Sequence, residues 1–280
     1  MIRHRDSFCK VTPLPMSFLS LLFLALLQGL TEFLPVSSSA HLKLFHLATG
    51  TEANALVLDV AVHIGTMAAV CLYFWRDVLL TLRGIADVLR GRLRTEGAQL
   101  FLLLSLATIP AIIVGLALKL SGLAEKLDLL WLMGSTMIIF GIILYWADKR
   151  APQTRTSWTW RDALIMGLWQ AVALVPGVSR SGATITAARF LGFERISAAR
   201  LAMLMSIPTI LASGSLLAVD VVKEGDWSLA GDAAIAAFIA FLAALLALRV
   251  MMTLLARVSF TPYVIYRILL GIVLLIIAAR

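Results

Sequence analysis

Long apolar segments alternate with short polar stretches along almost the whole chain. The apolar segments run over residues 14–34, 42–48, 53–75, 98–118, 127–147, 162–178, 181–193, 196–222, 229–256 and 261–279. An α-helix rises about 1.5 Å per residue, so about 20 residues are needed to cross the hydrocarbon core of a bilayer. The uninterrupted segments of that length are 53–75, 98–118, 127–147, 196–222, 229–256 and 261–279. We therefore predict an all-α integral membrane protein with six transmembrane helices.

The remaining apolar segments form two pairs that do not look like ordinary spans. Segments 42–48, 162–178 and 181–193 are too short to cross a membrane. Segment 14–34 is long enough, but Glu32 lies near its end. We expect each pair to form a re-entrant helical hairpin, which enters the membrane and returns to the same side.

Charges between the segments predict how the chain is oriented. Stretch 76–97 carries five arginines and stretch 148–161 carries four basic residues, so both are expected on the cytoplasmic side. Stretch 220–232 is mainly acidic and is expected outside. These signs place the first hairpin on the outer side and the second on the inner side. They also place the basic N-terminus outside, against the usual bias, and a cleaved signal peptide is the alternative for that end.

The two hairpins match each other in sequence. With an offset of 142 residues, the identical pairs are Gln28 and Gln170, Val36 and Val178, Ser37 and Ser179, and Ser39 and Ser181. Matched sequence in opposite orientation predicts an inverted repeat within one membrane domain, with halves at approximately 14–147 and 162–279. Such folds place paired broken helices and the binding site near the bilayer midplane. The repeat also argues against removal of the first segment.

The first hairpin contains a polar cluster in its break. The cluster comprises Gln28, Glu32, Pro35, Ser37, Ser38, Ser39 and His41. The glutamine and glutamate share one helix face, the proline ends that helix, and the serines begin another where backbone N–H groups can face an anion. Capping and helix packing would also explain the serines. Glu32 and His41 favour a functional site, because ionisable residues inside a membrane are costly.

The second hairpin contains a different polar cluster. It comprises Pro176, Gly177, Ser179, Arg180, Ser181, Gly182 and Thr184. The two glycines are expected to permit a tight turn and a close approach of backbone to ligand. Arg180 offers a planar fork of donors suited to phosphate, although an arginine that snorkels to the interface is the alternative. His63, four residues after Asp59, is also intramembrane, and a self-satisfying pair with Asp59 is an equally good explanation for it.

Composition limits the class of protein and its partners. The chain is 61% hydrophobic and 14% charged, whereas soluble domains are about 25% charged. The excess of 24 Lys and Arg over 16 Asp and Glu fits positive cytoplasmic loops, so no nucleic-acid partner is expected. Cys9 and Cys71 form neither a disulfide framework nor a metal-ligand spacing. No nucleotide-binding GxxxxGK[ST] loop and no HExxH metal motif is present.

The two clusters closely resemble the two signatures of bacterial undecaprenyl-diphosphatase, the bacitracin-resistance protein family. The resemblance extends over nearly the whole chain, including residues 59–66 and 259–267. It implies six spans and two re-entrant hairpins in the bacterial cytoplasmic membrane, with the active site facing outside. It also implies removal of the terminal phosphate of undecaprenyl pyrophosphate, which regenerates the carrier lipid for cell-wall synthesis. A divalent cation, Mg²⁺ or Ca²⁺, comes with the resemblance.

Site residues follow from this resemblance and from the two clusters together. The positions that match the family's site are Glu32, Ser38, His41, Ser179, Arg180 and Thr184. To these the clusters add the substrate-binding candidates Ser37, Ser39, Gly177, Ser181 and Gly182. Glu32 and Gln28 are the candidate metal ligands. Many family members have Glu where this chain has Gln28, and a neutral amide contributes an oxygen but no charge.

The expected reaction is phosphoryl transfer, helped by positioning and charge neutralisation. Arg180, Ser179 and Thr184 are expected to grip the pyrophosphate. Ser38 is the preferred nucleophile, with His41 as its base; direct attack by His41 and attack by metal-bound water are the alternatives. The rival function is transport of a polyprenyl phosphate, which needs no nucleophile. Membrane lipid is the expected surrounding, and a homodimer is left open.

Overall fold

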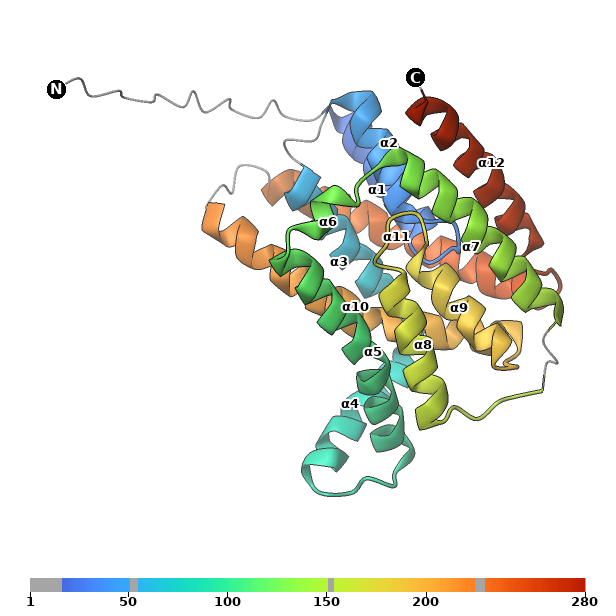
Figure 1. Ribbon diagram of the computed structural model, residues 1–280. Helices are drawn as coiled ribbons and strands as arrows, with labels where there is room; N and C mark the ends of the chain where they lie inside the picture. The colour runs from blue at the N-terminus through green and yellow to red at the C-terminus, as the bar shows by residue number, and fades with distance from the viewer. Residues whose placement is uncertain (1–16, 51–54, 151–153, 225–229, 280) are drawn as a thin grey trace.

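The computed structural model describes residues 17–50, 55–150, 154–224 and 230–279 (Figure 1). The helices are α1 (Phe18–Thr31), α2 (Ser38–Thr49), α3 (Ala55–Tyr73), α4 (Trp75–Leu89), α5 (Glu96–Leu120), α6 (Leu123–Lys126), α7 (Leu130–Arg150), α8 (Trp160–Val172), α9 (Arg180–Phe190), α10 (Arg195–Glu224), α11 (Ala230–Leu255) and α12 (Thr261–Ala278). Extended pairing within these ranges is limited to one bridge between Arg155 and Phe193. The all-helical fold expected from the sequence is confirmed.

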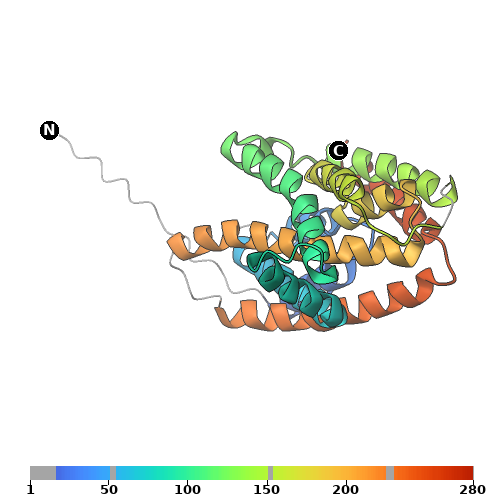
Figure 2. The same ribbon diagram turned by 90° about the horizontal axis from the view of Figure 1, so that it is seen from below.

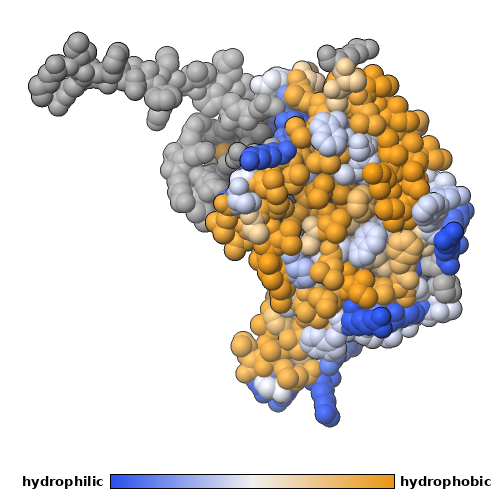
Figure 3. All heavy atoms as spheres, in the orientation of Figure 1, coloured by the Kyte–Doolittle hydropathy of each residue, from blue (hydrophilic) through white to orange (hydrophobic). Residues whose placement is uncertain are grey.

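Five helices are long and apolar enough to cross a membrane: α5, α7, α10, α11 and α12. Helices α3 and α4 meet the same criteria only together, and they are bent by 91° at their junction. The described chain therefore has five candidate spans, or six if the bent pair counts as one. Large apolar side chains such as Ile113, Phe238 and Leu269 are exposed on the outer faces, and Figure 3 shows an almost continuous apolar surface. Such a surface suits lipid rather than water.

The arginine-rich stretch 76–97 was expected to be a loop, and this was wrong. Most of it forms α4, which folds back on the start of α5 through a contact between Gly84 and Gly97. Apolar residues recur among the arginines at helical spacing, which explains why the stretch is helical. Helix α4 and the start of α5 project from the body in Figure 1, toward the viewer in Figure 2.

The short helices lie where the sequence predicted two broken segments. Helices α1, α2, α8 and α9 contain 14, 12, 13 and 11 residues, so none reaches the length of a span. Helix α1 packs closely on α11, where Gly29 lies against Ala240, and α8 packs on α5, where Gly167 lies against Ala107. Small residues at these contacts let the backbones approach, as is usual in membrane bundles. Helices α1 and α8 are thus each held by a long helix from the other half of the chain.

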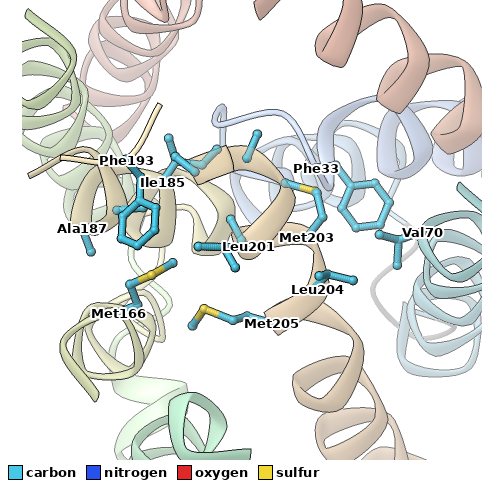
Figure 4. Packing of buried hydrophobic residues seen from close by; sticks show 14 of the residues in the cluster. Phe33, Val70, Met166, Ile185, Ala187, Phe193, Leu201, Met203, Leu204 and Met205 are labelled. Carbon is cyan, nitrogen blue, oxygen red and sulfur yellow. The ribbon is translucent and has the colours of Figure 1, made fainter. Parts of the chain in front are cut away.

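The largest buried apolar cluster connects the two broken segments. Phe33, from the first break, belongs to the same cluster as Ile185 of α9 and Met203 of α10 (Figure 4). At another point of this region, Asp148 of α7 pairs with Arg189 and Arg195 at 3.1 and 2.8 Å. Dense packing fixes the positions of the backbone breaks, which otherwise lack regular hydrogen bonds.

Candidate active site

The two backbone breaks meet in the middle of the bundle. Ser181 at the start of α9 donates to the carbonyl oxygen of Leu34 in the first break, at 2.9 Å. The guanidinium of Arg180, beside it, donates to Glu32 Oε1. The two polar clusters predicted from the sequence therefore form one site.

Glu32 is the centre of this site. Its Oε2 atom accepts hydrogen bonds from Gln28 Nε2 and from Ser38 Oγ, both at 2.8 Å. His63 Nε2, from α3, lies 3.7 Å from the same oxygen. The carboxylate is buried, and a buried charge is tolerated only when it is paired and hydrogen-bonded. Arg180 and the hydroxyl and amide donors together meet that requirement.

The expected pair between Ser38 and His41 is not formed. His41 Nδ1 bonds to the carbonyl oxygen of Ser37 at 2.7 Å, and Nε2 bonds to the hydroxyl of Tyr266 at 2.5 Å. Because a carbonyl only accepts, Nδ1 carries the proton, and in the neutral ring Nε2 accepts from Tyr266. The ring lies parallel to that of Tyr266, while the Ser38 hydroxyl points across the break to Glu32. Residues three apart on a helix share a face, but their side chains here take different partners.

Two serines have nearly the same unusual backbone φ angle. Ser37 and Ser179 have φ of 70° and 69°, and they are the non-glycine residues with positive φ in the described ranges. Each precedes a short helix and hydrogen-bonds to the second serine after it: Ser37 to Ser39 at 3.1 Å, and Ser179 to Ser181 at 3.2 Å. Positive φ costs a β-carbon residue free energy and concentrates at functional sites. The sequence match between the breaks thus has a structural counterpart.

The glycines of the second cluster allow close packing within the protein. A β-carbon on Gly177 would collide with Met133 and Thr136 of α7, and one on Gly182 would lie 2.5 Å from an Arg267 nitrogen. The Gly182 N–H is already bonded to Ser179 Oγ at 3.1 Å. The expected contribution of backbone donors beside Gly177 and Gly182 to a ligand stays a prediction.

Thr184 lies one turn into α9. Its buried hydroxyl donates to the carbonyl of Arg180 at 2.8 Å, within the same helix. The expected contact of the Thr184 hydroxyl with pyrophosphate stays a prediction. That contact would require the side chain to adopt a different rotamer.

A cavity of about 520 Å³ opens beside the site. Its lining residues are Ser38, Ser39, Leu42, Lys43, His46, Asp59, His63, Ala124, Asp128, Met133 and Pro176. An ion pair of Lys43 with Asp128 at 2.8 Å and a hydrogen bond between His46 Nε2 and Asp59 Oδ1 at 3.3 Å border it. The Ser38 side chain is therefore accessible to a ligand in the cavity. Glu32 does not line the cavity and lies behind Ser38.

Comparison with known proteins decides the family. Residues 21–273 match the family described as bacitracin resistance protein BacA. The chain belongs to the BacA family. It is 58% identical over 265 residues to a protein of Dinoroseobacter shibae named undecaprenyl-diphosphatase, covering 94% of this chain and 99% of that relative. Proteins of the same name from a Jannaschia species and Chromohalobacter salexigens are 56% and 43% identical, over 94% and 93% of this chain.

Three residues of this BacA-family site were missed as site residues. His63 was left open between a functional residue and a self-satisfying pair with Asp59; its Nδ1 bonds to the Asp59 backbone oxygen at 2.6 Å, and its Nε2 faces Glu32. Tyr266 gave no signal, since interfacial tyrosines are common in membrane helices. Arg267 did give one, because it is an arginine inside the apolar segment 261–279.

Arg267 fastens the two breaks together. Its side chain is fully buried and donates to the carbonyl oxygens of Val178 at 2.8 Å, Gly177 at 3.2 Å and Pro35 at 3.5 Å. Broken helices leave carbonyl groups without backbone partners, and a guanidinium can satisfy several at once. Arg267 therefore holds both breaks from α12.

The residues around Glu32 do not fit a divalent cation held by two protein ligands. Both carboxylate oxygens already accept from Arg180, Ser38 or Gln28, and Gln28 presents its amide nitrogen rather than its oxygen. The described residues contain no group of three or more His, Cys, Asp or Glu side chains suited to a metal. The Gln28 oxygen is buried without a hydrogen-bond partner, so one neutral oxygen is available after a rearrangement.

Proposed function

We propose that this chain removes the terminal phosphate of undecaprenyl pyrophosphate and so regenerates undecaprenyl phosphate for cell-wall synthesis. The observation that carries the proposal is the hydrogen bond from Ser38 to Glu32 beside an open cavity, with Arg180 on the other carboxylate oxygen. A hydroxyl bonded to a carboxylate is a nucleophile with its base. The name undecaprenyl-diphosphatase, shared by relatives across nearly the whole chain, supports the same reaction.

The geometry favours Ser38 as the attacking group and Glu32 as its base. Ser38 Oγ attacks the terminal phosphorus, its proton passes to Glu32, and the phosphoanhydride bond breaks. Undecaprenyl phosphate leaves with the bridging oxygen. Water then attacks the phosphoserine and releases inorganic phosphate, and Ser38 regains a proton from Glu32 while the remaining proton of water passes to solvent.

Arg180 and His63 provide the positive charge and hydrogen-bond donors that phosphoryl transfer needs. The Arg180 fork contacts Glu32 and lies one-fifth exposed, within reach of an anion that enters beside Ser38. His63 lines the cavity and faces the Glu32 oxygen that accepts from Ser38. Stabilising charge in preorganised positions accounts for most of the rate in such reactions.

His41 is assigned a supporting role. Direct attack by Nε2 would require its bond to the Tyr266 hydroxyl to break first. With its other nitrogen fixed on Ser37, the ring instead holds the break in its positive-φ conformation.

The full membrane arrangement is part of the proposal. It has six spans, formed by α3, α5, α7, α10, α11 and α12, and two re-entrant hairpins in an inverted repeat, with the site facing outside. The matched backbone at Ser37 and Ser179 and the matched packing of α1 and α8 support it. Cysteines placed singly at 90 and 155 should react only after permeabilisation, and one at 50 should react in intact cells. Homodimer formation stays a prediction without a described contact.

The divalent cation also stays a prediction, and no step above passes through it. Gln28→Glu would place a second carboxylate beside Glu32 and should create a stronger cation requirement than the natural chain has. Titration of Mg²⁺ and Ca²⁺ binding by calorimetry, alongside turnover, measures the change.

Phosphate release by the purified protein in detergent tests the function against the transporter alternative. Hydrolysis needs no sealed compartment, whereas transport does. Release of inorganic phosphate from undecaprenyl pyrophosphate in micelles supports the phosphatase. Lipid movement across sealed vesicles without phosphate release would identify a transporter instead.

A further inference from the structure

The arm formed by α4, the turn at 90–95 and the first turn of α5 contains none of the candidate site residues. It projects from the helical body and leaves α3 at a 91° bend (Figures 1 and 2). Close contact of Gly84 with Gly97 holds its two sides together, and Asp77 ties it to Arg200 of α10. The arm is therefore an ordered part of the fold, and it presents a defined set of side chains on its outer surface.

That surface carries two adjoining sets of side chains. Its exposed apolar residues are Trp75, Leu79, Leu82, Leu89 and Leu93. Its exposed basic residues are Arg76, Arg83, Arg90, Arg92 and Arg94. On α4 the arginines recur every seven residues, each one position after an exposed apolar residue, so the two sets run side by side along the helix.

The acidic residues of α4 are used inside the protein. Asp77 pairs with Arg200, and Asp87 accepts from the Thr95 hydroxyl at 2.9 Å. Glu96, at the start of α5, is the acid that stays exposed on the arm. The outer surface is therefore strongly positive although the arm contains three carboxylates.

Neither water nor hydrocarbon suits this surface. In water, a row of exposed leucines, one of them 83% exposed, would be an unusually large apolar patch. In hydrocarbon, the arginines would each be costly. The boundary between lipid headgroups and acyl chains suits both sets, because apolar side chains enter the chains while guanidinium groups contact phosphates.

We propose that this arm lies on the membrane surface and binds anionic phospholipid headgroups. The charge selects the partner: five arginines against one exposed acid favour an anionic surface over a zwitterionic one. A second copy of the chain is a poorer occupant, because a two-fold contact would bring the same positive surfaces together. The proposal depends on the membrane location of the chain and not on its phosphatase activity.

The test measures how deeply the arm enters bilayers of different charge. A spin label is placed on Leu89→Cys in full-length protein whose native cysteines, Cys9 and Cys71, are replaced by serine. The protein is reconstituted in phosphatidylcholine vesicles with and without phosphatidylglycerol. Collision with oxygen reports hydrocarbon, and collision with a water-soluble nickel chelate reports water.

Phosphatidylglycerol should move the label from water toward hydrocarbon, and high salt should partly reverse the shift. Neutralising Arg83, Arg90, Arg92 and Arg94 with glutamine should abolish it. Each arginine that contacts the surface should change the ratio of immersed to free arm by about fivefold. The control variant, with Lys149, Arg150 and Arg161 changed to glutamine, should behave as the parent does.

Circular dichroism and gel filtration confirm that each variant is folded before it is compared. Equal accessibility with and without phosphatidylglycerol would overturn the assignment of an anionic partner. Immersion that survives loss of the four arginines would do the same. Dipolar broadening between labels at high dilution in lipid would identify a second copy as the occupant.

Discussion

The two hairpins share one backbone design but carry different chemistry. Ser37 and Ser179 have the same positive φ, and each begins a short helix after a break. At the offset of 142 residues, Ser38 corresponds to Arg180. The inferred nucleophile and the inferred phosphate-binding cation thus occupy equivalent places in the two halves.

The remaining equivalent positions differ in the same way. Glu32 corresponds to Leu174, and His41 corresponds to Ala183. Gln28 donates to Glu32, whereas its counterpart Gln170 donates to the backbone oxygen of Ala107 at 3.2 Å. The first hairpin therefore contains the proposed reacting groups, and the second contains the proposed phosphate-binding cation and a packed support. The matched backbone breaks provide two equivalent positions for a site. A few side chains decide which of the two carries the proposed reacting groups.

The largest effect is expected from the reacting pair of the first hairpin. Ser38→Ala and Glu32→Gln should each lower kcat by about 10³-fold, and the double variant should be little worse than either, because the two act as a unit. Phosphate release in detergent measures this. Ser215→Ala is the control: its exposed side chain bonds within α10 to the carbonyl oxygen of Leu211 at 2.6 Å, and it should keep normal activity. A Ser38→Ala protein with more than about a tenth of normal turnover would remove Ser38 from the reaction.

A smaller but still large effect is expected from the cation of the second hairpin. Arg180→Lys keeps the charge but loses the fork that reaches Glu32 and phosphate, so turnover should fall by about 10²-fold. Arg161→Lys, at an exposed arginine near the start of α8, is the matched control and should keep normal turnover. Normal turnover of a folded Arg180→Ala protein would show that the second hairpin contributes structure alone.

Arg267 should affect both hairpins at once. Arg267→Met removes the donors that satisfy carbonyls in the two breaks and should destabilise the protein by about 3 kcal/mol. The thermal midpoint of the detergent-solubilised protein should fall, and turnover should fall with it. Unchanged stability together with lost turnover would place Arg267 in contact with substrate instead.

The smallest effect is expected from His41 and Tyr266. Each holds the other, so His41→Gln and Tyr266→Phe should each lower kcat by about tenfold, without additivity. Their kinetics should be measured singly and together. Complete loss in His41→Gln, with Tyr266→Phe unaffected, would support the histidine as nucleophile.

The sequence predicted the breaks well because they depend on local signals. Pro35, the serines and the interrupted apolar pattern are readable without tertiary structure, and both breaks lie where they were expected. The contacts between the breaks depend on side-chain direction over long sequence distances. Spacing alone favoured Ser38 with His41, whereas the fold joins Ser38 to Glu32 and His41 to Tyr266, which is 225 residues away.

Helix α4 was missed for a different reason. Its arginines were interpreted only as evidence for the membrane orientation. The helical spacing of its apolar residues was not used. A 91° bend separates it from α3, and its tertiary contacts, the packing on α5 and the pair of Asp77 with Arg200 of α10, are contained in no local pattern.

The central claim is that Ser38 attacks the terminal phosphate with Glu32 as its base. Rapid quench of a single turnover, with substrate labelled on that phosphate, tests it most directly. The account predicts an acid-stable label that maps to Ser38 and is absent from Ser38→Ala protein. An acid-labile label on His41, or a completed turnover with no label on the protein at any time, would contradict it.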